Sequence, residues 1–252
     1  MEATRANLFF AKGVIIVEGD AENLLIPTIA EIIGKPLHRY GVSIVNVGST
    51  AFKRYADIFK RKDGSDFGVP VSIISDLDVR ALEYYKAKDE DFPSGIADAS
   101  DLEKARAAKK KEIEDANNEG EIHIYLPNQW TLEYEIACSK LQKYLFCAVY
   151  VAKREDNKKF RYEKALLEAD KKWAELYGGE TIEDDKQRAY DIFSELDDGK
   201  ASKAATAQYL ADMLSKQYQK EIGDNSENTI KYILEHDPYL QYIIDAIKHV
   251  TK

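Results

Sequence analysis

The stretch GVIIVEGDAENLLIPTIAEII, residues 13–33, decides the fold of this chain. Its first part, Val14–Val17, is a run of β-branched residues and predicts a fully buried strand. Its second part, Glu22–Ile33, has apolar residues at helical spacing and stops at a glycine, which commonly follows the end of a helix. A buried strand followed at once by a helix predicts a parallel α/β sheet. Two carboxylates, Glu18 and Glu22, stand at the junction.

The alternation of strand and helix continues as far as residue 139. Repeated strand–helix–strand units with short connections predict a parallel sheet that is covered by helices on both faces. We expect the other strands at Ser43–Val47, Val69–Ile74 and Ile122–Leu126, and the other helices at Ala51–Phe59 and from about Thr131 to Ser139.

Two further segments have a helical pattern without strands. Val79–Gly120 is rich in Ala, Lys and Glu and is interrupted at Pro93–Gly95, which predicts a helical insert. After about residue 155 the strand pattern is absent, so we expect residues 1–150 to form the sheet and residues 151–252 a helical part. The helices of this second part are expected at Tyr162–Leu176, Asp185–Leu196, Lys203–Gln219 and Ser226–Lys248.

The charge of the chain limits its function. Among 252 residues, 45 are acidic and 36 basic, which gives a net charge of −9. An acidic balance argues against a dedicated nucleic-acid-binding module, whose surface is usually basic. Local basic runs can still contact phosphate beside an acidic cleft, although we favour the interpretation that each is a solvated helix face. These runs are Lys53–Arg54, Lys60–Lys62 and Lys109–Lys111.

No segment predicts a membrane span or a secretory leader. The longest apolar runs, Val14–Val17 and Leu24–Ala30, are much shorter than the roughly 20 residues of a transmembrane helix. We therefore expect a cytoplasmic protein. Cys138 and Cys147 lack the spacing of a metal site, so we expect buried thiols.

Acidic residues follow three of the predicted strands at the point where each strand ends. Ligands of open parallel sheets bind outside the carboxyl ends of the strands, so we expect these acids to face one site. The three groups are Glu18 with Glu22, Asp76 with Asp78, and Glu133 with Glu135.

Carboxylates gathered in this way need a cation. Two of them about 5 Å apart repel by roughly 3 kcal/mol at an effective dielectric of about 20, and a divalent cation removes that cost. Oxygen ligands favour Mg²⁺ or Mn²⁺ over Zn²⁺, and the four histidines are scattered without ligand spacing. Each acid alone is equally explained by the helix dipole, which favours acids at helix starts. Their common placement at three strand ends favours the metal site.

Several motifs resemble a known family. Glu18-Gly19-Asp20-Ala21-Glu22 and Ser75-Asp76-Leu77-Asp78, each after a strand, resemble the toprim domain of topoisomerases, primases and several nucleases. The run from ATRANLFFAKGVIIVEGDAENLLIP through VNVGSTAFKRYADIF to SDLDVR is similar to the toprim region of the OLD (overcoming lysogenization defect) nucleases. The later segments NQWTLEYEIA and SKAATAQYLADML also resemble this family.

The resemblance implies both a fold and an activity. The fold would be a toprim domain, Rossmann-like, in residues 1–150, with its helical insert at about 79–120 and a helical domain at 151–252. The activity would be that of an endodeoxyribonuclease that cleaves DNA with two Mg²⁺ or Mn²⁺ ions, and Lys203 would place its charge on the scissile phosphate. One ion would be held by Glu22, Asp76 and Asp78, and the other by Glu18, Thr131 and Glu133.

One departure from the family concerns ATP. Members normally carry an N-terminal ABC-type ATPase, whereas this chain has no G-x-x-x-x-G-K-[ST] phosphate loop and therefore no ATP site. We expect a C-terminal region or a separately made nuclease half, with an ABC-type ATPase domain as its partner.

Two alternatives stay open. A non-catalytic toprim module would bind DNA or act as a scaffold, and it would lack part of the acidic set that this chain retains. A haloacid-dehalogenase-like phosphatase also places D-x-D at a strand end with Mg²⁺, and it would use Asp76 as its nucleophile.

Overall fold

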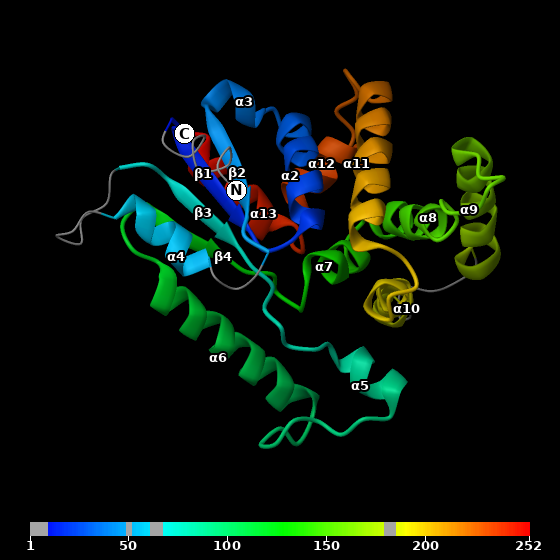
Figure 1. Ribbon diagram of the computed structural model, residues 1–252. Helices are drawn as coiled ribbons and strands as arrows, with labels where there is room; N and C mark the ends of the chain where they lie inside the picture. Colours follow the sequence, from blue (N-terminus) through cyan, green and yellow to red (C-terminus); the bar gives the residue numbers. More distant parts are fainter. Residues whose placement is uncertain (1–9, 49–51, 61–67, 179–184) are drawn as a thin grey trace.

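The structure is a computed structural model, and it describes residues 10–48, 52–60, 68–178 and 185–252 (Figure 1). A few residues named above lie outside these ranges. They are the start of the quoted toprim run, the predicted helix start Ala51, and Arg61 and Lys62 of one basic run; the side chain of Lys53 is likewise not described.

The centre of the molecule is a four-stranded parallel sheet. Its spatial order is β2-β1-β3-β4, and all three neighbouring pairs run parallel. Strand β1 lies inside the sheet and is buried at every residue, as its β-branched sequence predicts. The four predicted strands and the parallel α/β fold are therefore confirmed. The strands are β1 (Gly13–Val17), β2 (Val42–Asn46), β3 (Val71–Ile74) and β4 (Ile122–Tyr125).

Helices cover both faces of this sheet (Figure 1). Successive strand residues point to opposite faces, so Ile15 packs into one hydrophobic cluster and Ile16 into the other. The covering helices are α2 (Asp20–Ile32) and α13 (Gln241–Val250) on the face of Ile15, and α4 (Phe52–Ala56) and α6 (Ala99–Asn117) on the face of Ile16.

The last helix of the chain returns to the sheet. The connection from β1 to β2 runs across the sheet in one direction, and the connection from β2 to β3 runs in the other. Because both crossovers are right-handed, α2 and α4 lie on opposite faces of the sheet. Helix α2 therefore covers only the β1–β2 half of its face, and the β3–β4 half of that face needs another helix. Helix α13 covers that half with Ile243, Ile244 and Ile247. Ser72 Oγ also donates a hydrogen bond of 2.7 Å to the carbonyl of Ala246. The boundary that we expected at residue 150 would place α13 in the helical part, although α13 packs on the sheet.

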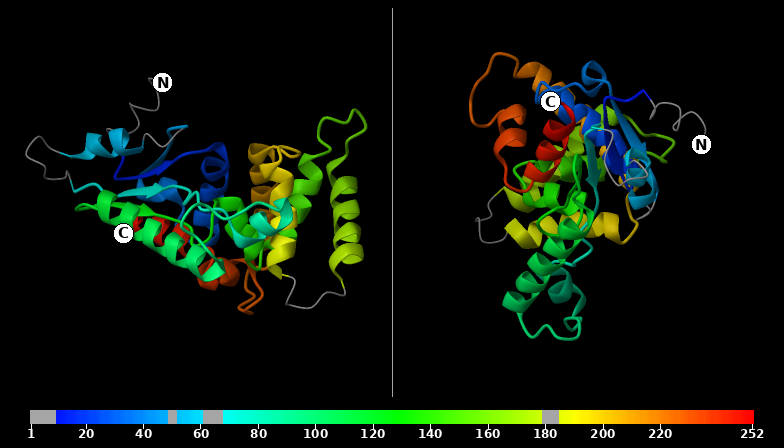
Figure 2. Two further views of the ribbon diagram at one scale, coloured as in Figure 1. Left: turned by 90° about the horizontal axis from the view of Figure 1, so that it is seen from below. Right: turned by 90° about the vertical axis from the view of Figure 1, so that its left-hand side faces the viewer.

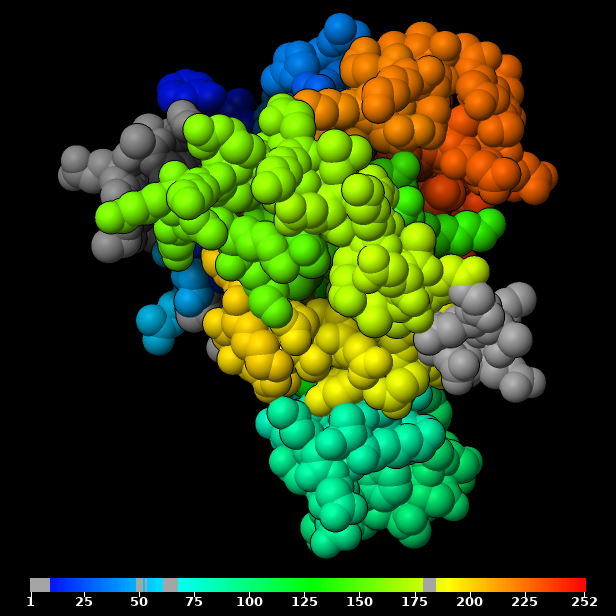
Figure 3. Space-filling view, turned by 90° about the vertical axis from the view of Figure 1, so that its right-hand side faces the viewer, coloured from blue at the N-terminus to red at the C-terminus, as the bar shows by residue number. Residues whose placement is uncertain are grey.

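The segment between β3 and β4 forms a helical insert, as predicted. It contains α5 (Leu82–Lys88) and α6, with a turn at Pro93–Gly95 between them. The α5 end of the insert projects from the body of the molecule (Figures 2 and 3). Trp130 packs against both Tyr84 of the insert and Phe193 of α10 (Asp185–Asp197), which ties the insert to the helical part.

The chain after β4 is helical. The predicted single helix at Ser226–Lys248 is wrong, because α12 (Ile230–His236) ends before Pro238 and α13 starts after it. Proline has no N–H for the helical hydrogen bond and disfavours a helical conformation at the residue before it. Helices α3 (Leu37–Tyr40) and α8 were not predicted. The remaining helices are α7 (Leu132–Cys138), α8 (Gln142–Ala152), α9 (Tyr162–Tyr177) and α11 (Lys203–Lys220).

Among the described residues, no helix is both long and apolar enough to cross a membrane. Both cysteines are free thiols: Cys147 is buried, as expected, whereas Cys138 is only partly buried.

Candidate functional site

The carboxyl ends of β1 and β3 form a topological switch point. The chain leaves these neighbouring strands toward opposite sides of the sheet, and open α/β sheets bind ligands in the crevice that results. Here the crevice is a cavity of about 440 Å³ where the starts of α2, α7 and α11 meet (Figure 1). Its charged lining residues are Glu18, Asp20, Glu22, Asp76, Glu133 and Lys203.

Glu18 and Glu22 come from the junction of β1 and α2. Ser75 Oγ donates a hydrogen bond of 2.5 Å to Glu18 Oε1 and so orients this carboxylate. Gly19 leaves room for Glu22, because a Cβ atom at residue 19 would lie 2.8 Å from Glu22 Oε2. A larger residue at this position would therefore shift the carboxylate of Glu22, the mobile end of that side chain.

Asp76 and Glu133 meet at the start of α7. The backbone N–H of Leu132 donates a hydrogen bond of 3.1 Å to Asp76 Oδ1. Thr131 is the N-cap of α7, where its hydroxyl accepts a hydrogen bond from the N–H of Tyr134. The same hydroxyl donates to Glu133 Oε2 at 3.1 Å. The loop after β4 thus holds two acids from distant parts of the sequence in fixed positions.

The carboxylates resist ionisation. Burial raises the pKa of Glu22 to about 7, and the charge of Glu133 adds to the effect. Burial also raises the pKa of Asp76 well above its ordinary value, again with contributions from Glu133 and Glu22. For Glu18 burial raises the pKa, the hydrogen bond from Ser75 opposes it, and the charge of Asp78 adds to it. In the absence of a cation, the cavity therefore disfavours the charged form of these acids.

Lys203 supplies a positive charge from the helical part. It is the first residue of α11, behind the N-cap Ser202, and its Nζ lies 3.3 Å from Glu133 Oε2. Burial alone would lower the pKa of Lys203, but the carboxylates of Glu133 and Asp76 outweigh it and raise this pKa. One ammonium offsets only part of the charge of the surrounding acids.

Two predicted site residues do not line the cavity. Thr131 acts through its contact with Glu133. Asp78 is exposed and has a φ of 53°, a left-handed conformation that Asp tolerates better than most residues. Its carboxylate acts on Glu18 through charge, and its carbonyl accepts a hydrogen bond of 3.3 Å from Lys109 Nζ.

The chemistry of these donors fits a hard divalent cation. All are carboxylate or hydroxyl oxygens, the ligand type of Mg²⁺ and Mn²⁺, and the buried negative charge is partly uncompensated. In the described part of the chain, however, no three His, Cys, Asp or Glu side chains are placed so that they hold a metal ion as they stand. A cation would therefore have to draw the carboxylates inward from their present positions.

Glu135, which we expected to face the site together with Glu133, does not line the cavity, and the family resemblance gave it no role. Glu135 is fully buried, and one carboxylate oxygen accepts a hydrogen bond from the N–H of Gln129, in the loop that carries Thr131. Its Oε2 has no hydrogen-bond partner among the described residues, and burial raises the pKa of this carboxyl to about 7. Glu135 follows Glu133 by two residues in the sequence, but only the fold shows that it faces the loop.

Other candidate residues lie apart from the cavity. His123 and His249, scattered in the sequence, stack with their ring centroids 4.6 Å apart. In the basic runs, Lys60 is paired with Asp57 and Glu119. Lys110 donates to the carbonyl of Leu126 and to Asn128, which lie in the loop after β4.

The fold and the acids at its strand ends define a toprim-type α/β domain. Residues 9–78 match the family model described as "Overcoming lysogenization defect protein-like, TOPRIM domain". The toprim resemblance drawn from the sequence is thus confirmed for this segment, which includes Glu18, Glu22, Asp76 and Asp78.

Solved structures of related regions also match the chain. The C-terminal region of the OLD protein of Xanthomonas campestris pv. campestris is 21% identical, with 97% of this chain and 94% of that chain covered and a TM-score of 0.48. The C-terminal region of the Burkholderia pseudomallei OLD protein is 21% identical, with 97% and 100% covered and a TM-score of 0.48. No curated protein matches the chain.

Proposed function

We propose that this chain is a nuclease that cleaves phosphodiester bonds of DNA with the help of divalent metal ions. The observation that carries the proposal is the meeting of Glu22, Asp76 and Glu133 around one cavity together with Lys203. They come from three strand ends and a distant helix, and burial, with their mutual repulsion added to it, raises carboxyl pKa values there. The match of residues 9–78 to OLD-like toprim domains supports the same interpretation.

The acids would hold Mg²⁺ or Mn²⁺, in two ions if the family pattern applies. Metal ions in such a site activate a water molecule and stabilise the departing oxygen. Glu22, Glu133 and Asp76 are the central ligands in this proposal, since all three line the cavity and act on one another by charge. The full ligand set would be Glu18, Glu22, Asp76, Asp78, Thr131 and Glu133.

The other polar side chains would position substrate and ligands. Lys203 is half-exposed, with 46% of its side chain accessible, so its ammonium can leave Glu133 and contact a phosphate oxygen. A cation at this position stabilises the charge that develops in the transition state. Ser75 and Thr131 orient the carboxylates of Glu18 and Glu133 through the hydrogen bonds described above.

DNA would reach the cavity past α6. Lys109 Nζ already binds the carbonyl of Asp78, directly after the acidic strand end. A phosphate contact from Lys109 would place the backbone of the DNA beside the acids and offset part of the negative charge of the chain. An ABC-type ATPase domain would belong to the complete system, as the OLD resemblance implies.

Cleavage of supercoiled plasmid tests the proposal. The protein is incubated with plasmid in Mg²⁺, Mn²⁺, Ca²⁺ or EDTA, in parallel with the Asp76→Ala variant. We expect nicked and linear DNA with Mg²⁺ or Mn²⁺, none in EDTA, and none with the variant. Cleavage that is equal in the variant, or absent in every metal, would contradict the proposal and favour the non-catalytic DNA-binding module.

A further inference from the structure

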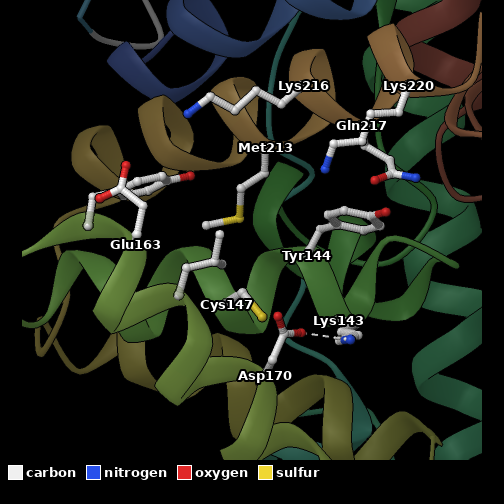
Figure 4. A pocket seen from close by; sticks show the side chains of 11 residues that line it. Lys143, Tyr144, Cys147, Glu163, Asp170, Met213, Lys216, Gln217 and Lys220 are labelled. Atoms are coloured by element: carbon white, nitrogen blue, oxygen red, sulfur yellow. Dashed lines mark ion pairs between the residues drawn. The ribbon is translucent and has the colours of Figure 1, made fainter.

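A second cavity lies in the helical part, between α8, α9 and α11 (Figure 4). Its volume of about 440 Å³ is within the usual range of small-molecule sites. None of its lining residues belongs to the acidic cavity, and it is formed by the half of α11 that is remote from Lys203. It is therefore a separate site.

The interior of this second cavity is apolar and aromatic. Met213 and Cys147 are buried, and Met213 points into the space between the helices in Figure 4. Tyr144 and Leu166 are half-buried and complete the apolar surface. The buried thiol is not a reactive group, because burial raises the pKa of Cys147 to about 12.

One polar group in the wall has an incomplete set of hydrogen bonds. The hydroxyl of Tyr162 is buried and makes no hydrogen bond of normal geometry with any described residue. The carboxylate of Asp212 lies close enough to act on this phenol through a hydrogen bond of poor geometry and through its charge, and it also accepts a hydrogen bond of 2.7 Å from Lys216 Nζ. A bound polar group would complete the hydrogen bonding of the Tyr162 hydroxyl.

The charges around the cavity are unevenly distributed. Lys143 is paired with Asp170 at 2.8 Å, and Lys216 with Asp212 at 2.7 Å. Among the described ion pairs none involves Lys220, whose side chain extends toward the space beside Tyr144 in Figure 4. Glu163 lies at the opposite end of the cavity. A cation without an ion pair among the described residues therefore stands at the Lys220 end, and an acid stands at the other.

We propose that this cavity binds a small organic anion with an apolar body and one anionic group, which lies at the Lys220 end. The body would be buried against Met213, Leu166 and Tyr144, and the anionic group would pair with the ammonium of Lys220. Apolar burial supplies affinity in such a site, while the single charge contact fixes the orientation of the ligand.

Two fluorescent probes of the same shape test this inference. The first is 8-anilinonaphthalene-1-sulfonate, and the second is N-phenyl-1-naphthylamine, which has the same rings without the sulfonate. Each is titrated into the full chain and into the variants Lys220→Glu, Leu166→Trp and Lys171→Glu. Lys171 is exposed on α9 outside the cavity, so its variant is a control with the same charge change.

We expect saturable binding of the sulfonate to one site per chain. The Lys220→Glu substitution should weaken the affinity for the sulfonate about 10-fold or more, since a charge-assisted contact becomes a repulsion. It should change the affinity for the neutral probe by less than about twofold. Leu166→Trp should block both probes by filling the cavity, and Lys171→Glu should change neither.

The inference is overturned if the sulfonate does not bind saturably, if Lys220→Glu leaves its affinity unchanged, or if Leu166→Trp still binds it. Circular dichroism and the thermal midpoint of each variant show that the fold is retained. The binding readout is independent of DNA cleavage, so this test and the test of nuclease activity can fail separately.

Discussion

The ammonium of Lys203 lies 3.3 Å from Glu133 Oε2, which joins the first residue of α11 to the first turn of α7. The Glu133 side chain is only 8% exposed, whereas that of Lys203 is 46% exposed. The acid is thus fixed within the cavity, and the cation is free to turn toward a substrate. This difference makes the two partners separable by mutation.

Lys203→Ala should slow DNA cleavage about 10²–10³-fold, the usual cost of removing a group that stabilises transition-state charge. The affinity for Mn²⁺ should be retained, because the carboxylates remain. Lys200→Ala is the matched control, since Lys200 pairs with Glu195 and Asp198 outside the cavity. Plasmid nicking rates and calorimetric Mn²⁺ titration of both variants check this. A large loss of metal affinity in Lys203→Ala would show that its role is misassigned.

Without metal, the protein should lose stability as the pH rises. The pKa of Glu22 is about 7 in the fold against an ordinary 4.5, so between these values the folded protein keeps a proton that the unfolded chain releases. Each pKa unit is worth about 1.4 kcal/mol, so the penalty reaches up to about 3 kcal/mol above pH 7.

Glu22→Gln should remove that penalty. In EDTA at pH 8 the variant should be more stable than the wild type, and at pH 4 the two should be equal. Urea unfolding at both pH values measures the difference, with Glu31→Gln, an exposed acid on the same helix, as the control. An equal stability of Glu22→Gln and wild type at pH 8 would mean that neither burial nor the neighbouring acids raise the pKa of Glu22 in the fold.

Glu135 should act as a positioning residue. Glu135→Ala removes the acceptor of the Gln129 N–H in the loop that carries Thr131, and should destabilise the protein by about 1–3 kcal/mol. It should also lower kcat for cleavage. Glu135→Gln keeps a carbonyl acceptor and should restore kcat to near the wild-type value. A purely structural role would give lower stability in Glu135→Ala with kcat per folded molecule unchanged.

Lys109 should contribute to DNA binding. Lys109→Ala should weaken binding and reduce the slope of log affinity against log salt by about one, because one phosphate contact is lost. Lys111→Ala, two residues further along the same helix and exposed, serves as the control. Fluorescence anisotropy with a labelled duplex over a salt series measures both slopes. Identical slopes in the two variants would remove Lys109 from the proposed DNA path.

Much of the fold could be predicted because its local signals agree. The β-branched run at Val14–Val17 and the amphipathic helix after it identify a buried parallel strand. The three other strands lie where their apolar runs predict them; β3 is fully buried, whereas β2 and β4 are only partly buried. The return of α13 to the sheet could not be predicted, since its apolar face is equally compatible with any partner surface. The break before α13 had a signal, Pro238, which the helical pattern on either side obscured.

The candidate site was predictable in part for a similar reason. Acids that follow strands are visible in the sequence, and the parallel sheet brings them to one edge. Ser75 and Glu135 gain their roles from hydrogen bonds across the fold, to Glu18 and to Gln129, which no spacing in the sequence reveals. The exposed position of Asp78 likewise depends on its backbone conformation.

The central claim is that acids from three strand ends share a divalent cation. The most direct measurement is calorimetric titration of Mn²⁺ into the EDTA-treated, dialysed protein and into Glu22→Gln, Asp76→Asn, Glu133→Gln and Asp20→Asn. Asp20 also lines the cavity, but its carboxylate accepts a hydrogen bond of 2.7 Å from Asn46 and is exposed, so its variant is the control.

The account predicts saturable Mn²⁺ binding to the wild type. Each of the first three substitutions should weaken the Mn²⁺ affinity about 10-fold or more, and Asp20→Asn should change it by less than about twofold. Absence of binding to the wild type, or equal affinity in all four variants, would contradict it.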